Sequence, residues 1–150
     1  MKQVVQEPAF AARWPGASFP AFESYVHKDL YLTEGSAICE YIGSLKPESG
    51  LIPSDPVKRA QITQWSTFAD MDIIGPLTAI NKAYLHITPY DEAMADGIMS
   101  GVDGRFRRLE AYLEGRKFLI GNSITLADIT MATCLQHAYM KFFYPEKRVS

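Results

Sequence analysis

The stretch FLIGNSITLADI, residues 118–129, decides how this chain is interpreted, because it combines a turn with a strongly specified helix start. Thr125 is a favourable N-cap residue, and Asp128 stands three positions later, where its carboxylate can reach the backbone N–H of Thr125. The pair predicts a capping box with Asp in place of the usual Glu or Gln. Ile124 and Ile129 are spaced to close over the cap as a hydrophobic staple.

The helix after this cap is apolar on most of its surface, which predicts a buried core helix. A buried helix start needs both devices, whereas a solvated one does not. We expect the core-facing stripe to consist of Ile129, Ala132, Leu135, Tyr139, Met140 and Phe143.

The composition is that of an ordinary globular protein, with 150 residues of which 47% are hydrophobic and 21% charged. A net charge of -2 gives no electrostatic reason to bind nucleic acid or an anionic membrane. No apolar run approaches the ~18 residues of a membrane span, and no signal-peptide pattern is present. Cys39 and Cys134 lie in apolar helical patterns, which favours free, buried thiols in a reducing compartment, the cytoplasm.

The first third of the chain predicts a small α+β unit. Residues 1–18 show no sustained period and are interpreted as loop or a short, poorly specified helix. Two short apolar runs between residues 19 and 32 flank a polar segment and predict a β-hairpin. A helical pattern begins near Gly35 and ends near Gly43. Residues 46–53, rich in Pro, Gly and Ser, predict a linker.

The pattern after the linker is helical. Ser54 or Asp55 caps a helix with Pro56 at its first position, and Gly75–Pro76 is expected to kink or break that helix. Its predicted stripe is Val57, Ala60, Trp65, Phe68, Ala69 and Ile73.

A second helix is predicted to start at Thr88–Pro89, with an apolar stripe of Val102, Phe106, Leu109 and Leu113. The glycines at 97, 101 and 104 either weaken this helix or let a neighbouring backbone approach closely. The order of a hairpin, a helix and then an all-helical part indicates an α+β protein.

Several strings resemble the glutathione S-transferase superfamily over about residues 8–145. FLIGNSITLADI resembles the approach to the family's capped core helix, and LTEGSAICEYI, residues 32–42, resembles its helix-start motif. QWSTFADMDI, residues 64–73, and LEAYLEGRKFLIGNSITLADIT, residues 109–130, are most similar to the branch formed by the transferase-like domain of the elongation factor 1 gamma subunit.

This resemblance implies a particular domain layout. Residues 1–45 would form a partial thioredoxin-like subdomain, a β-hairpin plus helix that carries the glutathione site. Residues 46–53 would form a linker, and residues 54–150 an all-α glutathione-transferase C-terminal domain.

The resemblance also implies a first set of site residues. In the family a cis-proline opens a strand, and the residue before it presents its backbone to the cysteinyl part of glutathione. Phe19 and Pro20 occupy these positions, although a trans proline at a strand edge is the alternative from base rates. The family's preceding Gly-Lys pair is replaced by Ala17-Ser18.

A second set lies at the next helix start, which would hold the γ-glutamyl end of glutathione. Glu34 could take the ammonium group, and the backbone N–H groups at Gly35 and Ser36 the carboxylate. The alternative is that Glu34 and Ser36 only cap the helix. Gly35 stands where the family has a hydroxyl residue, so one side-chain hydrogen bond to glutathione is lost.

Other candidate residues are interpreted as structural. Asp70 and Asp72 are two positions apart and do not face each other on a helix, which argues against an acid/base or metal pair. His27, His86 and His137 have no Cys or acid partner at a metal-ligand spacing, so no metal is expected.

The catalytic residue is unknown. A thioredoxin-like half begins with a β-α-β unit of roughly 30 residues, which would carry the family's catalytic Tyr, Ser or Cys. Residues 1–18 do not match such a unit, so the chain is expected to be a fragment, a shortened product or a divergent stub. Tyr25 and Tyr31 lie in the hairpin and match no catalytic position.

The resemblance leaves three functions open. The first is a cytoplasmic binding and assembly module of the elongation factor 1 gamma type in translation elongation, with weak glutathione binding. Its partners would be elongation factor 1 subunits or a second copy in a homodimer. The second is a transferase that conjugates glutathione, as co-substrate, to electrophilic small molecules in detoxification. The third is a truncated product that retains the helical half and little activity.

Overall fold

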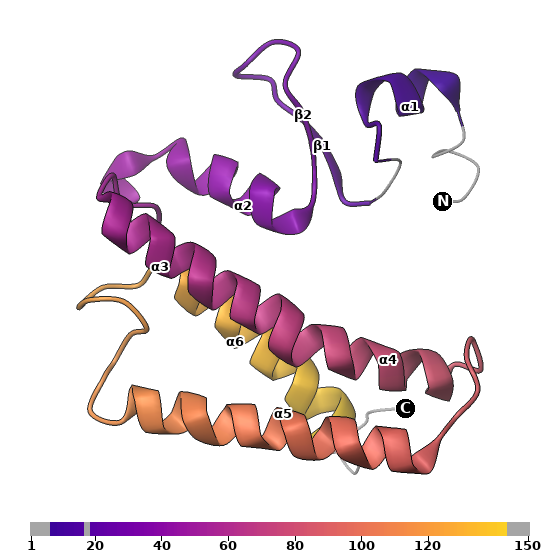
Figure 1. Cartoon of the computed structure of the whole chain (residues 1–150). Coiled ribbons are helices and arrows are strands. Elements are labelled where there is room, and N and C mark those ends of the chain that lie inside the picture. The colour runs from indigo at the N-terminus through magenta and orange to yellow at the C-terminus, as the bar shows by residue number, and fades with distance from the viewer. Residues whose placement is uncertain (1–6, 17–18, 144–150) are drawn as a thin grey trace. The chain divides into compact units, whose positions relative to one another are not determined.

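The structure, a computed structural model, describes residues 7–16 and 19–143 (Figure 1). The chain divides into two compact units, Met1–Ser49 and Gly50–Ser150, and each is described by itself. The division falls inside the predicted linker, while the assignment of residues 1–45 and 54–150 to particular domains stays a prediction. Among the described residues, every helix is too short or too polar to cross a bilayer.

The first unit is a two-stranded antiparallel sheet with helices before and after it. Its elements are α1 (Pro8–Arg13), β1 (Ala21–Glu23), β2 (Tyr31–Thr33), α2 (Gly35–Ser44) and the short 3-10 turn η2 (Pro47–Ser49). In the sheet, Ala21 stands opposite Thr33 and Glu23 opposite Tyr31. The predicted hairpin and the helix starting at Gly35 are therefore confirmed.

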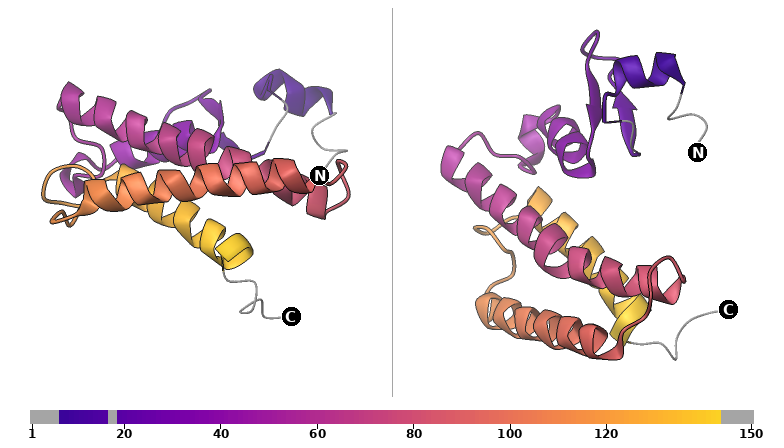
Figure 2. Two further views of the ribbon diagram at one scale, coloured as in Figure 1. Left: turned by 60° about the horizontal axis from the view of Figure 1, so that its bottom comes forward. Right: turned by 45° about the vertical axis from the view of Figure 1, so that its right-hand side comes forward.

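The second unit is all-helical, which confirms the predicted fold class. Its elements are α3 (Pro56–Thr67), the π-helical segment η3 (Phe68–Ile74), α4 (Gly75–Tyr84), α5 (Glu92–Leu113), α6 (Leu126–Ala138) and the π-helical turn η4 (Tyr139–Phe143). Figures 1 and 2 show α3, η3 and α4 as one continuous rod. Helix α5 packs against α4 and η3, and α6 packs against α3 and η3.

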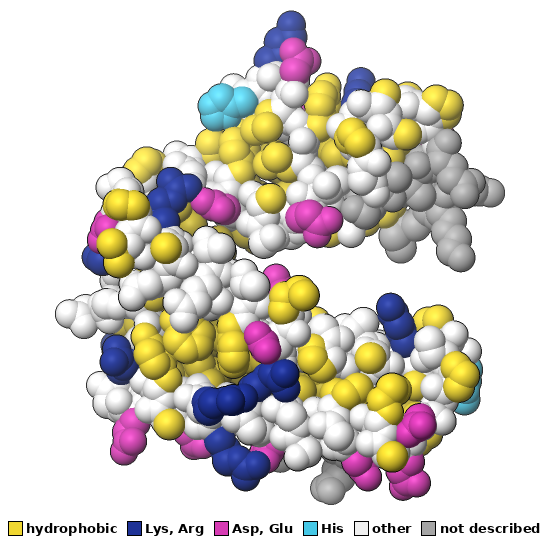
Figure 3. Space-filling view, in the orientation of Figure 1, with side chains coloured by type: hydrophobic (Ala, Val, Ile, Leu, Met, Phe, Trp, Pro, Cys, Tyr) yellow, Lys and Arg dark blue, Asp and Glu magenta, His cyan; other side chains and the backbone are white. Residues whose placement is uncertain are grey.

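The core of this unit lies between these helices. Its most deeply buried large side chains are Ile73, Leu77, Ile80 and Val102. Predicted stripe residues Val102 and Leu109 are buried, and Phe106 and Leu113 pack against the core. On the face shown in Figure 3, hydrophobic side chains also reach the surface between α3 and α5.

Two helix starts illustrate how local sequence sets the boundaries. Asp55 caps α3 by accepting a hydrogen bond from the N–H of Val57 at 2.9 Å, with Pro56 at the first position as predicted. The predicted start of α5 at Thr88–Pro89 is wrong. The helix begins after Asp91, whose carboxylate accepts from the N–H of Met94 at 2.8 Å, because this cap satisfies a free helix-end N–H group.

Of the predicted kink or break at Gly75–Pro76, the break does not occur, and the irregularity takes the form of a π-helical segment. The helix continues because the residues before it widen into the π-helical segment η3, in which the N–H of Gly75 donates to the carbonyl of Asp70. A wider turn leaves room for the proline ring, which would otherwise collide with the preceding turn. A Cβ added at Gly75 would lie 3.2 Å from that carbonyl oxygen, so glycine suits the position.

The predicted core-facing stripe of α6 is on the wrong face. The buried residues are Ala127, Met131, Cys134 and Ala138. Of the predicted stripe, Leu135 is half-buried while Ile129, Tyr139 and Met140 are exposed. Ile129 and Met131 are both apolar, so residue type alone does not separate the two faces at the start of α6, and the exposed side is marked only later by Thr133, Gln136 and His137. Ile124 is exposed as well, so the predicted staple is not a buried contact.

Further side chains differ from prediction in their exposure. Val57 and Ala60 on α3 are exposed, since the core side of that helix is marked by Ile62. Cys134 is buried as predicted, but Cys39 on α2 is exposed because the buried position there is Ile38.

The glycines of α5 do not admit a neighbouring backbone. Among the described residues, nothing lies within 4 Å of a Cβ added at Gly97 or Gly104. At Gly101 the neighbour is the Arg105 guanidinium, 2.9 Å from the added Cβ. Glycine at 101 therefore leaves space for Arg105, whose Nε donates to Oδ1 of Asp72 at 3.2 Å.

Candidate functional site

The predicted glutathione-binding residues lie at one end of the β-hairpin. Because the strands are antiparallel and Ala21 stands opposite Thr33, the segment before β1 meets the segment after β2. This end carries Phe19, Pro20, Glu34, Gly35 and Ser36. A Cβ added at Gly35 would lie 4.0 Å from Cγ of Pro20, so the two segments are in direct contact.

The peptide bond between Phe19 and Pro20 is cis, as the resemblance implied. Phe19 is 49% exposed, so a ligand can reach it. An exposed segment at a strand end can bind an extended peptide through its main chain. This is the chemistry that the cysteinyl part of glutathione requires.

The start of α2 has the properties of an anion site. The N-cap residue Glu34 makes no capping hydrogen bond with its side chain, and the first turn of α2 contains no acidic residue. The positive end of the helix dipole is therefore not neutralised by a side chain of its own turn. Glu34 itself is exposed, and its backbone φ is 68°, a value that residues other than glycine rarely adopt.

Helix α1 borders this site, which the sequence analysis missed. The ring of Phe10 lies 5.6 Å from the ring of Phe19, and Trp14 donates its indole N–H to the carbonyl of Phe22 at 3.1 Å. Trp14 also makes an edge contact with Tyr31 at 5.3 Å. The four-residue spacing of Phe10 and Trp14 was the available signal, since such pairs lie on one helix face.

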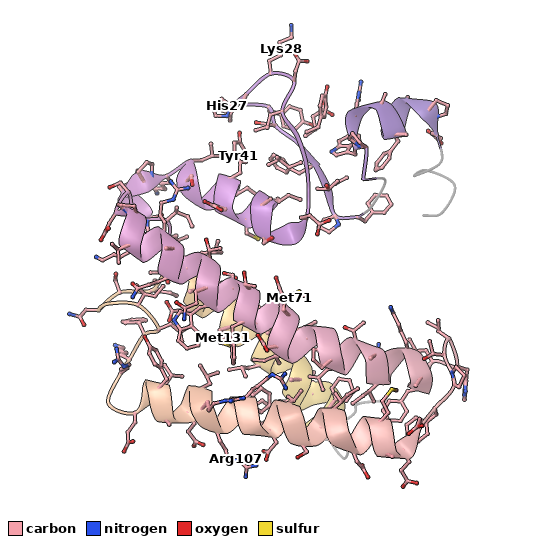
Figure 4. All side chains as sticks on the ribbon, in the orientation of Figure 1. His27, Lys28, Tyr41, Met71, Arg107 and Met131 are labelled. Carbon is pink, nitrogen blue, oxygen red and sulfur yellow. The ribbon has the colours of Figure 1, made fainter. Side chains whose placement is uncertain are left out.

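A second cluster lies at the opposite end of the hairpin, where Ser24, His27 and Tyr41 form a hydrogen-bonded chain. Figure 4 shows His27 and Tyr41 on the same side of the hairpin. The Ser24 hydroxyl oxygen accepts from the N–H groups of Val26 and His27 at 3.2 and 3.0 Å. Both of its lone pairs are then used, so its O–H donates to the Tyr41 oxygen.

The chain continues from Tyr41 to His27. The Tyr41 oxygen lies 2.8 Å from Nδ1 of His27, and the tautomer of the imidazole decides which of the two groups donates. Ser24 is buried and Tyr41 belongs to α2, so the cluster fastens α2 to the hairpin loop. Its effect on the candidate site is one of positioning, because it holds the helix whose start contributes Gly35.

The predicted cap of α6 is a structural site in the second unit. Asp128 Oδ2 accepts from the backbone N–H of Thr125 at 2.8 Å and from its hydroxyl at 2.9 Å. Asp128 Oδ1 accepts from the N–H of Leu119 at 2.8 Å. The N–H of Leu126 donates to the carbonyl of Leu51 at 3.1 Å. Thr125 is 3% exposed, so this helix start lies inside the protein.

The remaining titratable candidates are separate from one another. Among the described residues, no group of three His, Cys, Asp or Glu side chains is placed to hold a metal ion. Asp72 binds Arg105 rather than facing Asp70. Burial, with a smaller contribution from Asp70, raises the pKa of the Cys134 thiol to about 11. A buried thiol of this kind is a poor nucleophile at neutral pH.

Comparison with known proteins gives the family of this chain. The chain belongs to the glutathione S-transferase family, since the family model described as glutathione S-transferase, C-terminal domain, matches residues 66–147. A glutathione S-transferase-like protein of Fusarium sp. named LUC7 is 32% identical over 142 residues, which cover 94% of this chain and 64% of the relative.

Similarity extends to the elongation factor branch. Elongation factor 1-gamma-A of Xenopus laevis is 33% identical over 142 residues, 94% of this chain and 31% of that protein. The solved GST-like domain of elongation factor 1-gamma from Saccharomyces cerevisiae superposes with a TM-score of 0.72 at 26% identity, covering 87% of this chain and 62% of that one. The chain spans less than two thirds of each of these proteins.

Proposed function

We propose that this chain is a glutathione-transferase-like domain of the elongation factor 1 gamma type, which acts as a binding and assembly module in translation elongation and binds glutathione weakly. The observation that carries the proposal is the similarity to elongation factor 1-gamma along 94% of the chain. That similarity includes both units rather than the helical unit alone.

The proposal also covers the binding partners of the chain and its cellular compartment. Its partners are elongation factor 1 subunits or a second copy of the chain, and its compartment is the cytoplasm. Residues 1–45 are the partial thioredoxin-like subdomain and residues 54–150 the transferase-type helical domain, joined by residues 46–53.

Weak glutathione binding is supported by the geometry of the first unit. Phe19 and Pro20 would take the cysteinyl part, while Glu34, Gly35 and Ser36 would take the γ-glutamyl part. The helix dipole at Gly35 favours the carboxylate, and the Glu34 carboxylate favours the ammonium group. Affinity is low because Gly35 offers no hydroxyl to the ligand.

Titration calorimetry with glutathione tests this site. We expect Gly35→Ser to bind about three- to tenfold more tightly than the unmodified chain, because it restores one hydrogen bond of about 1 kcal/mol. The added Cβ has room, since its nearest neighbour is 4.0 Å away. Ser36→Ala is the matched control at the next position. Equal glutathione affinity of Gly35→Ser and the unmodified chain would mean that Gly35 is not part of the site.

The assembly role needs a separate measurement. Purified chain mixed with the other elongation factor 1 subunits should form a complex in sedimentation velocity, and the complex should persist in Gly35→Ser. Failure to form it, with glutathione binding intact, would contradict the assembly role and leave the ligand site standing.

The alternative function is a glutathione transferase, favoured by the similarity to the Fusarium transferase-like protein. Conjugation requires the thiolate of glutathione and a donor that stabilises it. Tyr25 and Tyr31 lie toward the loop end of the hairpin, away from Pro20, since Tyr31 pairs with Glu23. We expect no conjugation of a generic aryl halide above the uncatalysed rate. Turnover abolished by a single Tyr or Ser substitution would favour the enzyme.

A further inference from the structure

Helix α2 is held in the first unit by contacts of two kinds. At its start, a Cβ added at Gly35 would lie 4.0 Å from Cγ of Pro20, and in its middle Ile38 is buried. Both contacts are apolar, and the attraction between apolar groups has no preferred direction. They therefore constrain only loosely how α2 is placed along and around its own axis.

The contact at Tyr41 is directional. The ring of Tyr41 lies 5.6 Å from the ring of Phe22 in β1, and its oxygen accepts the hydrogen bond from Ser24 and lies 2.8 Å from Nδ1 of His27. Ser24 is buried and is itself held by the backbone N–H groups of Val26 and His27. Because a hydrogen bond weakens steeply when its distance or angle changes, this contact sets the position of α2 on the hairpin.

The position of α2 determines the geometry of the candidate glutathione site. Tyr41 comes six residues after Gly35, which is about 9 Å along the axis of a rigid helix, so a shift at Tyr41 reaches the helix start undiminished. The γ-glutamyl half of the site is at this helix start, whereas Phe19 and Pro20 of the cysteinyl half precede β1. A ligand that spans both halves requires them to be placed within about 0.5 Å of one productive arrangement.

We infer that Tyr41 is a positioning residue for the γ-glutamyl half of the glutathione site, on which it acts through α2. The inference rests on the glutathione binding proposed above. Tyr41 contacts the loop end of the hairpin, opposite the end that carries Pro20, and therefore does not touch the ligand. Its hydroxyl determines how well the two halves of the site fit one extended ligand.

Tyr41→Phe tests this role, because it removes the hydroxyl and keeps the ring that packs on Phe22. Titration of the full chain with reduced glutathione is followed through the backbone amide signals by NMR. We expect the dissociation constant to rise about three- to tenfold, as for the loss of one or two hydrogen bonds. At saturation, the signals of Gly35 and Ser36 should shift less than in the unmodified chain, while the signal of Phe19 should shift equally.

Two further variants control this measurement. Tyr25→Phe removes a hydroxyl from a fully exposed tyrosine of the same hairpin loop and should change the affinity less than twofold. Ser24→Ala removes the hydrogen bond to Tyr41 from the other side and should reproduce the loss. The double variant should bind only slightly more weakly than either single variant, because both act through one contact. Ser24→Ala carries the same test if Tyr41→Phe loses its circular dichroism spectrum.

Two outcomes would overturn the inference while the glutathione site stands. One is an unchanged affinity in Tyr41→Phe, and the other is an equal loss of shift at Phe19 and Gly35, which would mean a general loosening of the unit. If glutathione does not shift Gly35 and Ser36 in the unmodified chain, the proposed glutathione site is wrong and the role of Tyr41 is wrong with it.

Discussion

The N-terminal ends of α2 and α6 differ in how their free N–H groups are satisfied. At α6, Asp128 binds Leu119 and Thr125, and Leu51 takes the next N–H group. At α2, the N-cap residue Glu34 is exposed, makes no side-chain capping bond and has a φ of 68°. Both ends belong to helices of similar length, so the contrast does not come from helix size.

Burial explains the contrast. An N–H group without a partner costs most where water cannot reach it, and Thr125 is buried. The start of α6 must therefore be satisfied by the protein itself. The start of α2 is exposed, so water or an anionic ligand can take the same role. A strained residue such as Glu34 is a common feature of ligand sites.

The largest expected difference concerns the two cysteines, one on each helix. The pKa of Cys134 is raised to about 11 from an ordinary 9.0, which lowers the thiolate fraction of this residue about a hundredfold at pH 8. Cys39 is exposed. A chromogenic aromatic disulfide should therefore react with Cys39 at least about a hundredfold faster. The Cys39→Ser variant leaves Cys134 as the reacting thiol. Similar reaction rates for Cys39 and Cys134 would mean that Cys134 on α6 is not buried in solution.

The next effect concerns the buried cap. Asp128→Ala should lower the free energy of unfolding by about 2–3 kcal/mol, because it leaves two backbone N–H groups without their charged acceptor. Thr125→Ala should cost about 1–2 kcal/mol. Urea denaturation measures both. The exposed cap Asp55 provides the control, since Asp55→Ala should cost less than Asp128→Ala, and the reverse order would show that the α6 start is solvated.

The smallest expected effect concerns Glu34, where one substitution should stabilise the fold and weaken glutathione binding. Glu34→Gly should raise the free energy of unfolding by about 0.5–1 kcal/mol, since glycine adopts a positive φ without strain. It should also weaken glutathione binding by removing the carboxylate. Glu34→Gln keeps the strain and removes only the charge, so it should weaken binding without stabilising the fold. A stability gain in Glu34→Gln would contradict this explanation.

Much of the fold could be predicted because strands, turns and helix caps are specified by residues that are close together in the sequence. The hairpin is marked by two apolar runs around a polar segment, and Pro56 after Asp55 marks the start of α3. The buried face of α6 could not be predicted, because Met131 and Ile129 are equally apolar and only the packing of neighbouring helices distinguishes them. Exposure of Cys39 depends on tertiary packing in the same way.

The membership of the candidate site stays a prediction, whereas its geometry could not be predicted from the sequence. Resemblance indicated Phe19, Pro20 and the residues around Gly35, and the strand register brings these two segments into contact. The conformation of Glu34 could not be read from its residue type, since only glycine signals a positive φ. The packing of Phe10 against Phe19 depends on a six-residue helix too short for a clear periodic signal.

The π-helical segment η3 amounts to one additional residue in an otherwise regular rod. Each residue of an α-helix turns it by about 100°, so a one-residue change rotates everything that follows by that angle. The buried residues Ala69, Ile73 and Leu77 lie at intervals of four residues and share one face of the rod. Deleting one residue between 68 and 74 would therefore turn Leu77 and Ile80 out of the core and drive Pro76 into the preceding carbonyl. The proline ring at position 76 therefore depends on the wider turn before it, which a regular α-helix does not provide.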